Sequence, residues 1–217
     1  RVYEVSGVGY EPRGGFSVEG RETTPESCPE LTELARSLIL CNDSHLHQRE
    51  NQWQLEGNPT EGALLAMGLK AGIDPDLLKE EYPRTDAIPF ESEHRFMATL
   101  HHDHAGHGFI VLKGAPERVL DMCSHQRVEG EDLPLDPGYW HGQVDAMGER
   151  GQRVLAVAFR SAGETDSELN FEDVEAGLTL LGLVGLIDPP REEAIAAVHQ
   201  CQSAGIRVKM ITGDHAA

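Results

Sequence analysis

Hydrophobic and polar positions in the N-terminal part of the chain predict a hairpin followed by three helices. Residues 3–20 alternate apolar and polar positions around several glycines, which is typical of a hairpin. In residues 27–43 one helical face collects the apolar side chains Leu31, Leu34, Ala35, Leu38 and Cys41. Asn58-Pro59-Thr60-Glu61 is a helix start, with Asn as the cap and Pro in the first turn, and its helix runs to Gly72. Asp74-Pro75 starts a short helix that ends near Tyr82.

From Arg84 onward the pattern changes to three successive strands, followed by two helices and a further strand. The predicted strands are Thr85 to Glu91, Arg95 to His101, Gly108 to Lys113 and Gln152 to Arg160. The predicted helices are Pro116 to Cys123 and Gly138 to Glu149. Helices and strands do not alternate regularly in this order. It therefore predicts an α+β fold, with an antiparallel sheet flanked by helices.

The C-terminal part of the chain follows a third pattern. Leu178 to Ile187 is a nearly continuous apolar strand, and Ile206 to Ile211 is a second buried strand. Between them Glu192 to Ser203 is a helix whose inward face carries Ile195, Val198 and Cys201. Strand, helix and strand in this order predict an incomplete parallel βαβ unit. We therefore expect a boundary near Asp188 that separates a first domain, residues 1–185, from a partial second domain, residues 186–217.

Composition and charge narrow the classes of function. The chain has 217 residues and a formal net charge of -19, which argues against nucleic acid as a partner. The same charge repels free anions, so any anion site must be built from local cations. The four cysteines are scattered without a C-x-x-C pair, as in a reduced cytosolic protein. No apolar run is long enough to span a bilayer, and a first residue other than Met suggests a piece of a larger protein.

A crowded histidine tract is the strongest local signal for a metal. His101, His102, His104 and His107 lie close together, and imidazoles at short spacing can chelate a metal. The tract also has the composition of a hairpin loop, which favours a solvated turn over a ligand set. We therefore predict no metal site, and a histidine-rich metal-binding module stays as the alternative function.

Standard nucleotide-binding motifs are absent from the chain. GVGYEPRGG lacks the third glycine of a dinucleotide fingerprint, and no G-x-x-x-x-G-K-[ST] loop occurs. A nucleotide would therefore have to bind without a glycine cradle. A free-standing phosphatase of the haloacid-dehalogenase class would need a D-x-D nucleophile at a strand end, and the sequence has none.

Three places nevertheless combine residues suited to a ligand. Lys113 ends an apolar strand and either reaches a cavity or extends to the surface, while Gly114 lets a ligand or a backbone approach closely. Phe90 either fills the core or offers a stacking face for a base, with Arg95 as a nearby positive charge. Thr212-Gly213-Asp214, after the last predicted strand, is either a phosphoryl-binding turn or an ordinary helix cap.

Taken in order, several stretches resemble the cytosolic part of P-type cation-transporting ATPases. These are GNPTEGALL, PFESEHRFM, LKGAPE, GERGQRVLAVAFR, DPPREEA and MITGDHAA. The opening YEVSGVGYEP is similar to the segment just after that family's phosphorylation site, so the resemblance covers essentially the whole chain. Ser92-Glu93-His94 is followed by Arg95, where heavy-metal pumps carry S-E-H-P. This difference, with KGAPE, favours the calcium/sodium/proton-type branch.

The resemblance implies a nucleotide-binding domain that holds ATP over a phosphorylation domain of haloacid-dehalogenase-like fold. Phe90 would stack on adenine, Lys113 and Gly114 would line the same pocket, and Glu61 would reach the adenine edge. The resemblance also gives roles to six further residues. Arg95 and Arg153 would meet the phosphates or ribose, Arg191 would lie at the hinge, and Thr212 with Asp214 (T-G-D, including Gly213) would belong to the phosphoryl side.

Other family motifs are missing, and their absence limits what the chain is expected to do. The nucleophilic motif D-K-T-G-T, the G-D-G-x-N-D motif, the actuator loop and the membrane helices do not occur. The resemblance thus implies a cytoplasmic, ATP-binding piece of an integral membrane pump that couples ATP hydrolysis to cation transport, inactive alone and without its catalytic Asp. Implied partners are ATP, Mg²⁺ in the whole pump, and the remaining phosphorylation, actuator and transmembrane domains. Alanine at Lys113 or Phe90 is expected to weaken nucleotide binding while the fold survives.

Overall fold

The computed structural model describes residues 1–50, 52–187 and 192–209. At its centre is a seven-stranded sheet with the strand order β10-β9-β12-β11-β8-β7-β6. All neighbouring strands pair antiparallel except β12 and β9, which are parallel. The strands are β6 (Arg84–Ile88), β7 (Phe96–His102), β8 (Gly108–Gly114), β9 (Cys123–Val128), β10 (Glu131–Pro134), β11 (Arg153–Ala162) and β12 (Leu178–Leu186). The predicted α+β class with a mainly antiparallel sheet is therefore confirmed.

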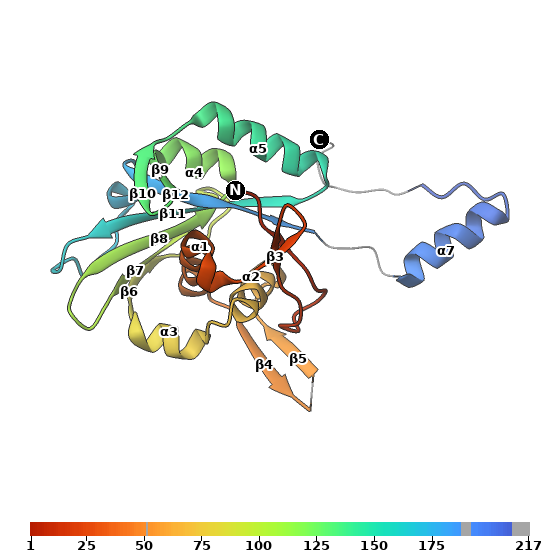
Figure 1. Cartoon of the computed structure of the whole chain (residues 1–217), viewed down its shortest axis with the longest axis horizontal. Coiled ribbons are helices and arrows are strands. Elements are labelled where there is room, and N and C mark those ends of the chain that lie inside the picture. The colour runs from red at the N-terminus through yellow and green to blue at the C-terminus, as the bar shows by residue number, and fades with distance from the viewer. Residues whose placement is uncertain (51, 188–191, 210–217) are drawn as a thin grey trace.

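Helices cover both faces of this sheet (Figure 1). One face is covered by α4 (Pro116–Met122) and α5 (Pro137–Glu149), and the other by α1 (Pro29–Leu40), α2 (Pro59–Lys70) and α3 (Pro75–Glu81). Strand β11 explains the two cores, because its side chains alternate between the faces. Ala156 packs in the core beneath α4 and α5, whereas Val157 packs in the core beneath α1 and α2.

The predicted helix starts are confirmed in atomic detail. Asn58 caps α2 by accepting a hydrogen bond from the Thr60 amide at 2.8 Å. Asp74 caps α3 in the same way, with 2.9 Å to the Asp76 amide. In both helices a proline occupies the first turn, where its missing N–H leaves no hydrogen bond unmade.

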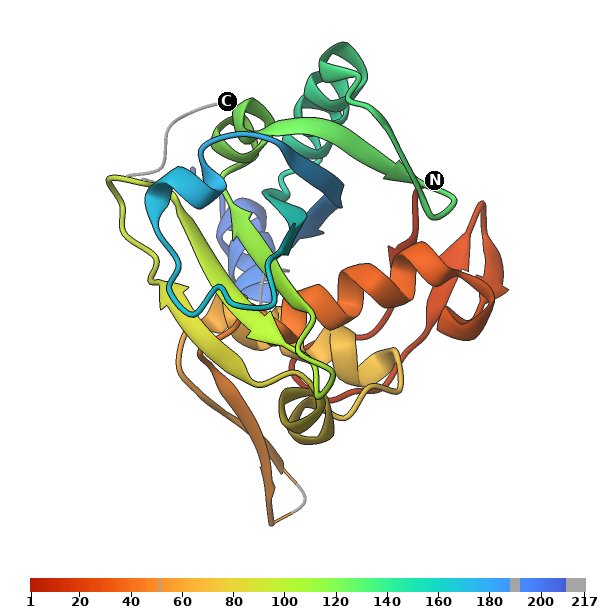
Figure 2. The ribbon, with the colours of Figure 1, turned by 90° about the vertical axis from the view of Figure 1, so that its left-hand side faces the viewer.

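Short elements surround the central layers. The predicted N-terminal hairpin is present as β1 (Glu4–Val5) and β2 (Phe16–Val18), extended by β3 (Arg21–Thr23). A second hairpin, β4 (His45–Arg49) and β5 (Gln52–Glu56), projects from the body (Figure 2). The pattern of apolar positions missed this hairpin and β9–β10, because most of their side chains are polar and exposed. The remaining elements are η1 (Pro25–Ser27) and α6 (Phe171–Val174).

The C-terminal segment differs from the predicted βαβ unit. The apolar strand β12 lies inside the seven-stranded sheet, between β11 and β9, rather than in a separate parallel unit. Helix α7 (Glu192–Ser203) forms as predicted, but Ile195 and Val198 are 46% and 37% exposed instead of inward. Residues 206–209 form no strand, and the rest of the predicted second strand lies outside the described residues. The apolar side of α7 thus has no covering surface in the part of the chain described here.

Among the described residues, no helix has the length and apolar character needed to cross a bilayer.

Candidate functional site

The strand register gathers five of the predicted site residues at one end of the sheet. Strand β8 ends in Lys113 and Gly114, which pair with Met97 and Phe96 at the start of β7. On its other side Gly114 pairs with Ala156, three residues after the start of β11. The loop after β6 leads from the same end. The residues brought to this end are Phe90, Arg95, Lys113, Gly114 and Arg153.

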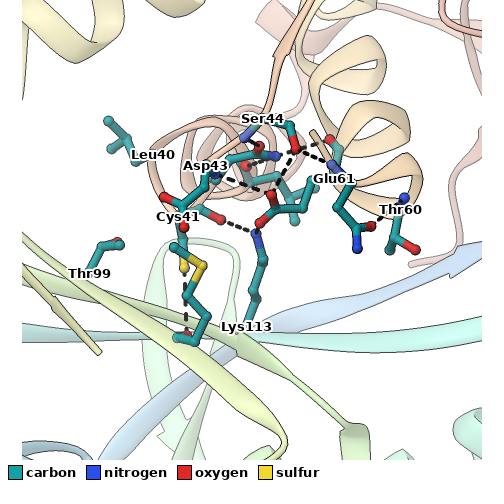
Figure 3. Close-up of polar contacts among 12 residues, drawn as sticks. Leu40, Cys41, Asp43, Ser44, Thr60, Glu61, Thr99 and Lys113 are labelled. Atoms are coloured by element: carbon teal, nitrogen blue, oxygen red, sulfur yellow. Dashed lines mark hydrogen bonds and ion pairs between the residues drawn. The ribbon is translucent and has the colours of Figure 1, made fainter. Parts of the chain in front are cut away.

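Lys113 is buried, but its ammonium has an ion-pair partner and a hydrogen-bond acceptor, which explains why the strand tolerates it. Its side chain points away from the sheet toward the ends of α1 and α2, and the residue is only 7% exposed (Figure 3). The ammonium Nζ lies 2.5 Å from Glu61 Oε1 and also donates a hydrogen bond to the carbonyl of Cys41. A buried ammonium is costly unless it is paired in this way.

Glu61 is itself held by a network of hydrogen bonds (Figure 3). Its second carboxylate oxygen, Oε2, accepts from Ser44 Oγ at 2.9 Å and from the Asp43 amide at 3.3 Å. Its backbone carbonyl accepts from Asn42 Nδ2 at 3.0 Å. Glu61 lies in the first turn of α2, where a carboxylate also interacts favourably with the helix dipole. The Glu61–Lys113 pair is therefore a fixed, buried anchor that joins α2 to the sheet.

Gly114 is required by its neighbouring strand. A Cβ atom at this position would lie 2.5 Å from the Arg95 carbonyl oxygen and 2.7 Å from Phe96 Cα. The sequence had left open whether a ligand or a backbone approaches this glycine, and the described structure shows a backbone. The Arg95 carbonyl also accepts a hydrogen bond from the Ala115 amide at 2.9 Å, which fixes the corner between β8 and α4.

The other residues at this end are exposed and surround the anchor. Phe90 is 59% exposed, so it does not fill the core. Arg95 has a φ of 60° and forms an ion pair with Glu117 at 2.6 Å. Arg153 donates a hydrogen bond to Thr60 Oγ1 at 3.4 Å, next to Glu61 at the start of α2. One open aromatic ring and two guanidinium groups therefore share the end of the sheet that holds Lys113.

Four of the other predicted site residues lie outside the described residues. They are Arg191, Thr212, Gly213 and Asp214. The four histidines of the tract have separate surroundings. His101 Nδ1 meets the Tyr82 carbonyl, His102 meets Thr85 and His107 meets Asp103, while His104 is exposed. In the described ranges, no three or more His, Cys, Asp or Glu side chains are arranged to hold a metal ion.

Comparison with known proteins identifies the family. The model of the P-type ATPase cytoplasmic domain N matches residues 30–193, which is most of the chain. The chain belongs to the P-type ATPase family. It is 46% identical over 98% of its length to a cation-transporting ATPase of Synechocystis sp., and 34% identical over 99% to a calcium-transporting ATPase of Bacillus subtilis. A calcium-transporting ATPase type 2C member 1 of Bos taurus is 36% identical over 97% of the chain.

These relatives are much longer than the chain. It covers 24% of the Synechocystis and Bacillus subtilis pumps and 21% of the bovine one. The resemblance to P-type cation-transporting ATPases is thus confirmed, and the chain corresponds to one cytoplasmic domain of such a P-type ATPase.

Several partners of the anchor were not found from the sequence. Cys41, Asp43 and Ser44 follow α1 and contact Glu61 or Lys113 through backbone groups or a hydroxyl. Thr60, which accepts a hydrogen bond from Arg153, was predicted only as part of a helix start. The one available signal was the polar run Asn42-Asp43-Ser44 just after a strongly apolar helix, because the last carbonyls of a helix lack internal partners and polar side chains there can supply them.

Proposed function

We propose that this chain is the ATP-binding domain of a cation-transporting P-type ATPase and that ATP binds at the sheet end that holds Lys113. The observation that carries the proposal is the exposed ring of Phe90 at the same end as the buried Glu61–Lys113 pair and two exposed arginines. An apolar platform with nearby cations suits a nucleotide, which has an aromatic base and anionic phosphates.

Phe90 would hold the adenine base. A phenylalanine that is more exposed than buried leaves an aromatic face free, and stacking a base on such a face contributes about 1–3 kcal/mol. Stacking needs no glycine-rich loop, which agrees with the absence of one in the sequence.

Arg95 and Arg153 would face the ribose or phosphates. Their guanidinium groups are exposed, and each is held by one contact that a phosphate oxygen could replace. In a chain with a net charge of -19, such local cations are what an anionic ligand requires.

Lys113, from β8, and Glu61, from α2, would form part of the wall of the base pocket. Sequence alone left open whether Lys113 contacts phosphate or lines the base pocket. Its burial and its pairing with Glu61 favour the second role, because moving the ammonium to a phosphate would leave a buried carboxylate unpaired. Gly114 would contribute a close backbone at the same place.

The remaining parts of the proposal concern the whole pump. Residues 1–185 would form the nucleotide-binding domain and residues 186–217 the start of the phosphorylation domain, with Arg191 at the hinge and Thr212, Gly213 and Asp214 on the phosphoryl side. The domain would lie in the cytoplasm beside a membrane part, and Mg²⁺ would accompany the ATP phosphates. By itself the chain would bind ATP without hydrolysing it, because the nucleophilic Asp is not in its sequence.

A calorimetric titration of the 217-residue chain with ATP tests the proposal. Phe90→Ala should weaken ATP binding about tenfold, which corresponds to the loss of one base stack. Tyr139→Ala is the matched control, since Tyr139 is also an exposed aromatic residue but lies on α5. Equal affinities of the Phe90→Ala variant and the unchanged chain would refute the assignment.

A further inference from the structure

A groove of about 500 Å³ lies between α1 and the start of β8, at the opposite end of that strand from Lys113. Its lining comes from three aromatic residues, Tyr82, Phe109 and Phe159, and from α1 and the η1 turn. The three aromatic side chains are partly exposed, so a ligand in the groove can reach them. None of the side chains discussed for nucleotide binding lines it. A cavity of this size suits a small molecule rather than a single ion.

Phe109 and Phe159 offer ring edges to the groove, because their ring faces are covered. His101 and Phe159 lie on the two strands that flank β8, and their rings stack on Phe109 with centroid distances of 5.5 Å and 5.8 Å. Beyond Phe159 the guanidinium of Arg127, from β9, lies 5.6 Å from the ring centroid. Ring edges carry partial positive charge and pair well with the face of another aromatic ring. The groove therefore suits the face of an aromatic ligand.

Arg36, on α1, supplies hydrogen-bond donors to the same groove. Its guanidinium carbon lies 4.9 Å from the centroid of the Tyr82 ring. Glu33, one turn earlier on the helix, binds Arg127 at 2.5 Å instead, and Arg36 forms no ion pair or side-chain hydrogen bond with any described residue. Arg36 is partly exposed, so its N–H groups can bind an acceptor that a ligand brings into the groove.

An ion of either sign is poorly matched by the groove. Its carboxylates are Glu26, which is exposed, and Glu33, which is partly buried and already bonded to Arg127. Burial raises the pKa of Glu33, so an anion placed beside this carboxylate would add to an existing cost. An organic cation would meet ring faces that Arg36 and Arg127 already cover. An uncharged ligand avoids both costs.

We propose that this groove binds an uncharged, flat aromatic molecule that carries a hydrogen-bond acceptor such as a carbonyl. Its ring face would meet the edges of Phe109 and Phe159, and its carbonyl would accept from Arg36. ATP, with its anionic phosphates, does not belong to this class of ligand. The inference does not rest on the proposed ATP site.

The test is an NMR titration of the isotope-labelled 217-residue chain with three naphthalene probes at pH 7. Naphthamide is uncharged and carries a carbonyl, naphthoate is an anion, and naphthylmethylamine is a cation at this pH. Naphthamide should bind about tenfold more tightly than either ion, with large backbone amide shifts at Arg36, Phe109 and Phe159. Saturating ATP should not displace it.

Arg36→Met tests the donor. Methionine keeps an apolar stem beside Tyr82 but donates no hydrogen bond. This variant should weaken naphthamide binding about tenfold, as expected for the loss of a charge-assisted hydrogen bond. Arg36→Lys should retain part of the affinity. Arg49→Met, at an exposed residue of β4, makes the same substitution elsewhere and should have no effect.

Phe159→Leu tests the ring edge separately. Leucine is apolar but has no aromatic ring, so this variant should bind naphthamide about threefold more weakly. If the variant does not fold, the Arg36 variants and the comparison of the three probes still decide the matter.

Four results would overturn the inference. The first is no saturable binding of naphthamide, which would leave the groove to water. The second is displacement of naphthamide by ATP or loss of its binding in Phe90→Ala, which would place it at the other end of the sheet. The third is an affinity that Arg36→Met leaves unchanged. The fourth is equal affinity for the three probes.

Discussion

Lys113 in β8 and His101 in β7 are both buried polar side chains, but they lie at opposite ends of the sheet and are satisfied in different ways. Lys113 forms an ion pair with Glu61 and a hydrogen bond to the Cys41 carbonyl. His101 has one partner, the Tyr82 carbonyl, and its other nitrogen has none. The difference shows that burial alone does not determine whether the polar atoms of a side chain are hydrogen-bonded. That depends on the partners that the surrounding residues offer.

The chain that follows α1 serves both ends of the sheet. The Cys41 carbonyl accepts from Lys113, and the carbonyls of Leu40 and Asn42 accept from Arg84. A helix C-terminus presents unsatisfied carbonyls and the negative end of its dipole, so cations are favoured there. One helix end thus holds a cation from each end of the sheet.

The largest effect is expected when the buried ion pair is broken. Lys113→Met should lower the free energy of unfolding by about 3–5 kcal/mol, because it leaves the Glu61 carboxylate buried without its cation. Urea denaturation measures this change. Removing both charges, with Glu61→Gln and Lys113→Met together, should recover much of the stability. A loss of less than about 1 kcal/mol in the single variant would contradict the role of the anchor.

This expectation changes how a nucleotide-binding test should be designed. From the sequence we expected Lys113→Ala to weaken nucleotide binding while the fold survives. With Lys113 paired to a buried Glu61, the same substitution should also reduce stability. Phe90, which is exposed, is therefore the cleaner probe of binding.

At the other end of the sheet the expected effect depends on pH. His101 has a folded-state pKa of about 4, below its ordinary value of 6.5, so the unfolded chain binds the proton more readily. Stability should therefore fall as the pH decreases from about 6.5 toward 4, by up to about 3 kcal/mol from this group. Denaturation at a series of pH values should show a smaller fall in His101→Phe than in the unchanged chain. Identical pH profiles would contradict the assigned burial of a neutral ring.

A smaller effect is expected at Gly114, beside the anchor. Gly114→Ala should cost about 1–3 kcal/mol, because the new Cβ would lie 2.5 Å from the Arg95 carbonyl oxygen. Gly142→Ala is a matched control on α5, where a Cβ meets no atom within 4 Å. The control should be stabilising by about 0.5–1 kcal/mol, since alanine is the better helix former. Thermal or urea denaturation of both variants would reveal the contrast, and equal effects would contradict it.

The smallest change in stability is expected at the exposed rim of the same end. Arg95→Gln removes an ion pair with Glu117 that is largely open to solvent. It should alter the free energy of unfolding by less than about 1 kcal/mol. Its affinity for ATP should nevertheless decrease several-fold and become less sensitive to salt. An unchanged ATP affinity, measured by calorimetry at low salt, would remove Arg95 from the proposed site.

Local patterns in the sequence predicted much of the fold. The alternation in residues 152–160 showed both faces of β11, and Asn58 and Asp74 marked the starts of α2 and α3. Hairpin β4–β5 gave no such signal, because an exposed strand pair needs no apolar alternation. Strand β12 was predicted as an element, but its place between β11 and β9 depends on long-range pairing that periodicity does not encode.

The candidate site could be predicted only in part. Lys113 stood out because a lysine at the end of an apolar strand is costly to bury, and Phe90 with Arg95 stood out as a stacking face beside a positive charge; the family resemblance added Glu61 and Arg153. The contact between Glu61 and Lys113 joins residues 52 positions apart, so it follows from tertiary packing. The reason for Gly114 was likewise visible only once the Arg95 carbonyl was in place.

The most direct test of the proposed ATP site is a map of backbone amide NMR shifts during titration of the chain with ATP. The account predicts that the largest shifts occur at Phe90, Arg95, Gly114 and Arg153. Amides at the other end of the sheet, such as that of Phe109, should change little. Shifts concentrated at that other end, or no saturable shifts at all, would contradict the account.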